Sequence, residues 1–159
     1  MRIIATLTGE GFPVDIVLHH DGHLSFIADA DIDVDGSGPS HGDPCYQPET
    51  TLHHEGKPLN SDVDKYIVVP PVLVKGVVPV VMGSLAHVTN LNNARTSCAV
   101  VGDVGPSRKT GEISRALAIE LGIDPDPQTG GMDTPNVLYK VFPGTAACVD
   151  GKQYHLQPS

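Results

Sequence analysis

Two acidic residues, Asp103 and Glu112, have the types and spacing that cleavage of a glycosidic bond requires. Asp103 directly follows an apolar run that ends at Gly102, and Glu112 lies nine residues later, just before a helical pattern. A carboxyl group that leaves a buried strand suits a proton donor, whereas the free N–H groups at a helix start favour an ionised carboxylate. We therefore predict Asp103 to be a general acid and Glu112 to be the base that activates water.

A purely structural interpretation of both residues is also available. An Asp before a Gly-Pro turn often caps that turn, and a Glu at a helix start is an ordinary capping residue. On local sequence alone this second interpretation is the simpler one. The choice between them depends on the elements that position the pair.

Those elements are predicted to be short strands joined by many turns. The 159 residues are 40% hydrophobic but only 4% aromatic, with 17 Gly and 14 Pro, which favours a mainly β or β-rich α+β domain. One helix is expected at 113–121, where Ile113, Leu117 and Leu121 share a face and Gly122 follows. Strands are expected at 1–7, 14–18, 66–70, 77–81, 86–90, 95–102, 137–142 and 153–156.

The chain length predicts one domain, 1–159. Residues 28–51 are rich in Asp, Gly, Pro and Ser, and we predict a long, loop-rich insertion over 28–65. The core of the domain is expected at about 66–145. Six short strands, long crossing loops and one or two short helices would fit a double-psi β-barrel-like core.

Five segments, read in order, resemble the family 75 glycoside hydrolases, the fungal and bacterial chitosanases. The segments are DIDVDG (31–36), YIVVPP (66–71), AVVGDVGP…GEIS (99–114), LGIDPDPQTGG (121–131) and NVLYKVFPG (136–144). The resemblance implies hydrolysis of β-1,4 links in partly deacetylated chitin with inversion, by an Asp and a Glu in a GD…GE segment. These two positions fall on Asp103 and Glu112.

A second resemblance overlaps the first. VTNLNNARTSCAVVGDVGP, followed by ISRALAIELGI, is similar to the rare lipoprotein A group and related double-psi β-barrels, in which an Asp cuts the glycan strands of peptidoglycan. Val104 stands where those proteins usually carry Arg, and Glu112-Ile113-Ser114 replaces their downstream Asp. This resemblance therefore supports the barrel fold more than the transglycosylase chemistry.

An alternating series of acids, Asp29, Asp31, Asp33 and Asp35, offers a second candidate site. DIDVDG resembles the start of an EF-hand, but Gly42 stands at the twelfth position and no flanking helices are evident. In the chitosanase-like interpretation Asp31, Asp33 and Asp35 would hold glucosamine ammonium groups, and a solvated acidic loop is the alternative.

Three further residues are expected to contact the sugar. Lys109 and Thr110 lie beside the carboxylates in sequence, where they would contact sugar hydroxyls. Tyr139 offers a ring for stacking, with core packing as its alternative role.

The net charge and the remaining motifs limit the classes of partner that we expect. A formal charge of −9 argues against nucleic acid, and no segment approaches about 18 uninterrupted apolar residues or forms an export signal. We expect a soluble protein with no membrane partner, secreted if a leader was removed and otherwise intracellular or delivered by a phage or toxin. Histidine pairs lack HExxH spacing, and Cys45, Cys98 and Cys148 match no zinc motif, so no metal or cofactor is expected.

Three functions follow from these patterns. The first is an endo-acting hydrolase of chitosan or a related amino-sugar polysaccharide that uses Asp103 and Glu112. The second is a peptidoglycan-cleaving lytic enzyme associated with a phage or toxin. The third is a non-catalytic binding or assembly module that has kept the barrel.

Overall fold

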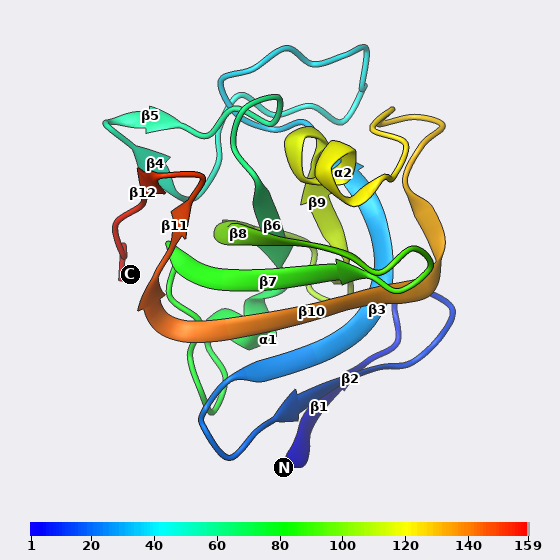
Figure 1. The fold of residues 1–159 in the computed structure, drawn as a ribbon, viewed down its shortest axis with the longest axis vertical. Helices are drawn as coiled ribbons and strands as arrows, with labels where there is room; N and C mark the ends of the chain where they lie inside the picture. Colours follow the sequence, from blue (N-terminus) through cyan, green and yellow to red (C-terminus); the bar gives the residue numbers. More distant parts are fainter. Residues whose placement is uncertain (159) are drawn as a thin grey trace.

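The fold is a closed barrel of six β-strands, which confirms the predicted mainly β class and strand number. The computed structural model describes residues 1–158. Pairing of the first and last barrel strands closes the sheet (Figure 1). In sheet order the barrel strands are β3 (Leu24–Asp33), β10 (Met132–Ala146), β7 (Ser84–Asn90), β8 (Arg95–Val104), β6 (Tyr66–Val69) and β9 (Glu112–Ser114).

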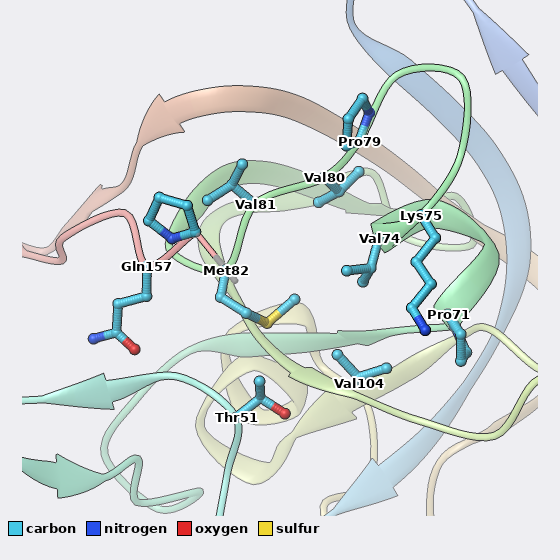
Figure 2. Close-up of a pocket in the computed structure, with 11 residues that line it drawn as sticks. Thr51, Pro71, Val74, Lys75, Pro79, Val80, Val81, Met82, Val104 and Gln157 are labelled. Carbon is cyan, nitrogen blue, oxygen red and sulfur yellow. The ribbon is translucent and has the colours of Figure 1, made fainter.

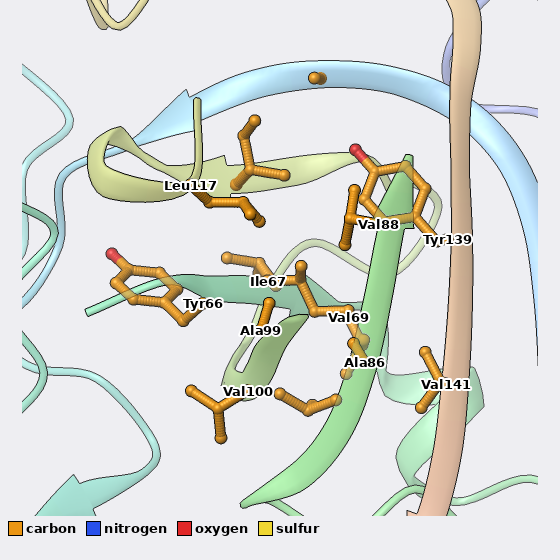
Figure 3. Close-up of a cluster of buried hydrophobic side chains, with 14 of the residues drawn as sticks. Tyr66, Ile67, Val69, Ala86, Val88, Ala99, Val100, Leu117, Tyr139 and Val141 are labelled. Atoms are coloured by element: carbon orange, nitrogen blue, oxygen red, sulfur yellow. The ribbon is translucent and has the colours of Figure 1, made fainter. Parts of the chain in front are cut away.

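The barrel interior is filled by β-branched and aliphatic side chains that alternate along each strand. Ile32, Ile113 and Ile67 are register partners across β3, β9 and β6, and all three are buried. Figure 3 shows Ile67 among side chains from other barrel strands, including Tyr139 of β10. Because side chains alternate between the two faces of a strand, the intervening residues must lie on the opposite face of the sheet.

Shorter elements surround the barrel. A hairpin of β1 (Arg2–Leu7) and β2 (Val14–Leu18) extends the sheet beside β3, and a turn at Gly22 joins β2 to β3. Two more hairpins pair β4 (His53–His54) with β5 (Lys57–Pro58), and β11 (Cys148–Val149) with β12 (Lys152–Gln153). The helices are α1 (Pro71–Val74) and α2 (Arg115–Leu121), so the predicted one or two short helices are also confirmed.

The prediction of a loop-rich insertion over 28–65 is wrong for its first six residues. Residues 28–33 belong to β3, so the barrel includes a strand outside the expected core of 66–145. The sequence misled because aspartates alternate with apolar residues here. That pattern is a strand whose apolar side chains enter the core while its acids share the other face.

Two other expected elements were also wrong. Residues 77–81 form no strand, and Val77 is 70% exposed. The helix expected at 113–121 begins at Arg115, because Ser114 is its N-cap and accepts a hydrogen bond from the Leu117 N–H. Glu112 therefore opens strand β9 and does not lie at the helix start.

Within residues 1–158 no helix is long and apolar enough to cross a membrane. The three cysteines are exposed free thiols.

Candidate active site

Strand register brings the two predicted catalytic residues to the same level of the barrel. Val68 of β6 pairs with Glu112 of β9 on one side and with Asp103 of β8 on the other. Asp31 of β3 is the next partner beyond Glu112. Two strand spacings separate the backbones of Asp103 and Glu112, which corresponds to about 10 Å.

Both residues face the same cavity, which has a volume of about 340 Å³. Asp33 and Asp35, also predicted to bind substrate, line it too. We call Asp33, Asp35, Asp103 and Glu112 the cleft carboxylates. The remaining lining residues are Ile32, Asp43, Cys45, Val68, Val104, Gly105 and Pro106.

Asp103 is held by hydrogen bonds from a distant loop segment. Its Oδ1 accepts from the Thr51 N–H at 3.0 Å, the Thr51 hydroxyl at 2.7 Å and the Val104 N–H at 2.9 Å. The residue is only 8% exposed. These bonds orient the carboxylate and leave Oδ2 as the oxygen that could accept a proton from water.

Asp33 and Asp35 are also held by backbone donors. Asp33 Oδ1 accepts from the Asp35 N–H at 2.7 Å and from the Tyr66 hydroxyl at 3.3 Å, and Asp35 Oδ1 accepts from the Gln47 N–H at 2.7 Å. Burial, together with the charges of Asp35 and Asp103, raises the pKa of Asp33 to about 7, although the hydrogen bond from the Asp35 N–H opposes the rise. Burial also raises the pKa of Asp35, with further contributions from Asp103 and Asp43.

The surroundings of Glu112 do not favour an ionised carboxylate. Burial and the charges of nearby aspartates, with Asp33 first among them, raise the pKa of Glu112 to about 8. Its carboxyl group packs against Gly105, where an added Cβ would lie 2.8 Å from Glu112 Oε2. The expectation that a helix end keeps Glu112 charged is therefore wrong, because the helix begins three residues later.

The remaining sugar-contact residues predicted from sequence lie outside the cavity lining. Tyr139 is 1% exposed, stacks on Phe26 at 4.9 Å and donates its hydroxyl to the Asp29 carbonyl at 2.6 Å, so its ring belongs to the core. Thr110 is 1% exposed, which leaves its hydroxyl out of reach of a sugar. Lys109 is exposed and lies close enough to Asp31 to oppose the rise in the pKa of Asp31, which burial causes.

A second, apolar cavity of about 480 Å³ adjoins the acidic one. Val104 lines both cavities, and Thr51, the Asp103 partner, lines the apolar one. Figure 2 shows Met82 between Thr51 on one side and Val80 and Val74 on the other. The other residues that line the apolar cavity are Pro71, Lys75, Pro79, Val81, Gln157 and Pro158.

The structure adds residues that sequence reasoning missed. Thr51 lies 52 positions before Asp103, and no local pattern connects the two. Asp43 reaches the cavity from the long loop, which the sequence marked only as acidic and irregular. Glu10, in the turn between β1 and β2, approaches the acids of β3.

The sequence matches no family model and no curated protein. The resemblance to chitosanases therefore stays a prediction that depends on the residues themselves.

Proposed function

We propose that this chain is a glycoside hydrolase that cleaves β-1,4 links in chitosan or a related amino-sugar polysaccharide. The observation that carries the proposal is the convergence of Asp103 and Glu112, from two strands that flank β6, on one cavity. An inverting hydrolase needs its two carboxyl groups roughly 6.5–9.5 Å apart, so that a water molecule fits beside the sugar. The backbone spacing of about 10 Å, with both side chains facing the cavity, is compatible with that requirement.

The environments of the two acids support the reverse of the roles expected from sequence. Glu112, with its raised pKa, suits the general acid that protonates the glycosidic oxygen as the C1–O bond breaks. Asp103, oriented by three donors to Oδ1, suits the base that takes a proton from water. That water attacks C1 from the opposite face, so the product has the inverted anomeric configuration.

The charge of the cavity supports a cationic substrate. The four cleft carboxylates lie close together with Asp43 beside them, and repulsion among these acids contributes to the raised pKa values of Asp33, Asp35 and Glu112. Ammonium groups of glucosamine residues would relieve that repulsion and favour ionisation of the aspartates. A neutral glycan would leave the repulsion in place.

The apolar cavity supports a polymer that also carries acetyl groups. Its walls are mainly Val, Pro and Met side chains, and it shares Val104 with the acidic cavity. An acetamido methyl group would gain from burial there, whereas an ammonium group would not. Partly deacetylated chitin presents both kinds of group along one chain.

Release of reducing ends from partly acetylated chitosan tests the proposal, with product anomers followed by NMR. We expect inverted product, and chitosan turnover above that of fully acetylated chitin. Release of muropeptides from peptidoglycan, without chitosan cleavage, would favour the lytic-enzyme alternative. If none of these glycans is cleaved, the proposed hydrolase activity is contradicted.

Calorimetry with the Glu112→Gln variant isolates substrate binding from cleavage. A bound polycation favours ionisation of Asp33 and Asp35. At a mildly acidic pH that keeps every sugar amine protonated, binding of glucosamine oligomers should therefore release protons. The release is measured as a dependence of the binding heat on the ionisation enthalpy of the buffer. N-acetylated oligomers of the same length are the matched control and should release none. Equal proton release by both would contradict recognition through ammonium groups.

A further inference from the structure

A second group of carboxylates lies beside the cleft, where the β1–β2 turn meets β3, and one member, Asp31, is the register partner of Glu112. Glu10, Asp29 and Asp31 each offer a carboxylate oxygen, and these atoms all lie within 4.8 Å of one another. Oxygen ligands on opposite sides of a Ca²⁺ ion, each about 2.4 Å from it, are separated by about 4.8 Å. We call these three residues the turn cluster.

Two oxygen atoms of the turn cluster are buried without a hydrogen-bond partner among residues 1–158. They are Asp29 Oδ1 and Glu10 Oε1, and Asp29 as a whole is only 4% exposed. Burial of an unpaired carboxylate is costly unless a proton or a cation compensates it. Burial, with the charges of Asp31 and Glu10, raises the pKa of Asp29 to about 8.

The backbone of Gly111 packs closely against the Asp29 side chain. At Gly111, where φ is +94°, an added Cβ would lie 2.4 Å from Asp29 Oδ1. Thr110, the preceding residue, has a buried hydroxyl that also lacks a partner in the described chain. Carboxylate oxygens from two segments, the β1–β2 turn and β3, therefore gather here, and two of them have no donor.

We propose that Glu10, Asp29 and Asp31 bind a divalent cation with hard, oxygen-preferring character, most readily Ca²⁺. Three carboxylates supply the charge that such an ion needs, and the arrangement leaves the remaining positions to water. The cleft carboxylates differ, because Asp33, Asp35 and Asp103 already accept hydrogen bonds from protein groups. The cation site does not depend on the proposed hydrolase activity.

The ion would connect two segments of the chain, the β1–β2 turn and β3, and both are hydrogen-bonded to the loop between β8 and β9. Glu10 belongs to the β1–β2 turn, whose Gly9 N–H donates to the Arg108 carbonyl, and Asp31 N–H donates to the Gly111 carbonyl at 2.7 Å. Cation binding therefore stabilises the loop between β8 and β9. This loop leads directly into Glu112, so the ion also helps to position that side chain.

Thermal unfolding of chelator-treated protein, with and without added Ca²⁺, tests the site. At about 100 times the dissociation constant we expect the unfolding midpoint to rise by roughly 5–10 °C. Asp29→Asn should abolish this rise, and in chelator it should be at least as stable as wild type, because the change replaces a carboxyl group that is buried beside two other acids by an uncharged side chain of the same shape. That expectation separates loss of binding from failure to fold.

The matched control is Asp35→Asn in the cleft, which should keep the Ca²⁺ response. A response that is lost in Asp35→Asn but kept in Asp29→Asn would place the ion in the cleft and overturn the proposal. An unchanged midpoint with millimolar Ca²⁺, Mg²⁺ and Mn²⁺ would also overturn it, and would indicate a proton shared between Glu10 and Asp29.

Terbium luminescence locates the ion independently of stability. The chain has no Trp, so excitation near 280 nm must reach bound Tb³⁺ from one of its 4 tyrosines. The Tyr139 hydroxyl lies 2.6 Å from the Asp29 carbonyl, whereas the Tyr66 hydroxyl lies 3.3 Å from Asp33 Oδ1 in the cleft. We expect Tyr139→Phe to remove most of the signal and Tyr66→Phe to keep it, and the reverse result would contradict the site.

Discussion

The cleft carboxylates and the turn cluster use neighbouring residues of the same strand in different ways. Asp33, at the end of β3, has hydrogen-bond donors from β6 and from the loop that follows it. Asp29, four residues earlier on the same face, has a buried oxygen without a donor. Similar acids on one strand are therefore distinguished by what packs above them.

The difference follows from the long loop after β3. This loop returns across the end of the strand and supplies the N–H groups of Gln47 and Thr51 to the cleft acids. The turn cluster is instead covered by a turn that contributes a third carboxylate, Glu10. Hydrogen-bond donors orient a carboxylate in the protein. A third carboxylate instead adds negative charge that a bound cation would compensate.

The largest expected effect comes from the two acids that the cleft would use for catalysis. Asp103→Asn and Glu112→Gln should each lower chitosan turnover by about 10²–10⁴-fold, because each removes a proton-transfer group. Reducing-end release measures the loss. Glu120→Gln, which changes a half-exposed carboxylate paired with Lys65 at 3.8 Å, is the matched control and should stay near wild type.

Both variants should keep their Ca²⁺-induced rise in unfolding midpoint, because neither changes the turn cluster. Wild-type turnover in either variant would remove that residue from the proposed mechanism.

The pH dependence of stability should show that both groups of acids are held against ionisation. The pKa values of Asp29, Asp33 and Glu112 are raised to about 8, 7 and 8. The unfolded chain therefore loses these protons first, and the free energy of unfolding falls as pH rises from about 4 to 8. We expect a midpoint several degrees lower at pH 8 than at pH 5, measured in chelator.

Asp29→Asn and Asp33→Asn should each flatten this slope, and Glu120→Gln should leave it unchanged. Added Ca²⁺ should remove mainly the part of the slope due to Asp29, because the ion competes with the proton for that carboxylate. A midpoint that rises from pH 5 to pH 8 would contradict the raised pKa values.

The smallest expected effect tests the donors that distinguish the cleft. Thr51→Val removes the hydroxyl bonded to Asp103 at 2.7 Å while keeping the side-chain shape. It should lower the free energy of unfolding by about 1–2 kcal/mol, seen in denaturant titration, and leave Ca²⁺ binding unchanged.

Thr6→Val is the matched control, because the Thr6 hydroxyl donates to Asp15 in an exposed pair at 2.8 Å. Its effect should be below about 0.5 kcal/mol. Equal losses in the two variants would show that the Thr51 contact has no special weight.

Much of the barrel could be predicted from the sequence. Strands were predicted at 66–70, 95–102 and 137–142, and the structure contains β6, β8 and β10 there. The same reasoning failed at 28–33, where alternating aspartates suggested a loop, and at 77–81, where valines suggested a strand. In both places local composition did not show how the segment pairs with other strands, and that pairing determines which face is buried.

The sequence by itself determined the mainly β class, the single short helix before Gly122 and the choice of Asp103 and Glu112 as candidates. Only the tertiary structure decided that Glu112 lies in a strand among other acids, which reverses its proposed role. It also brought Thr51 to Asp103 and Glu10 to Asp29. The physical reason is that pKa values and ligand sets depend on groups close in space, and barrel closure joins residues far apart in sequence.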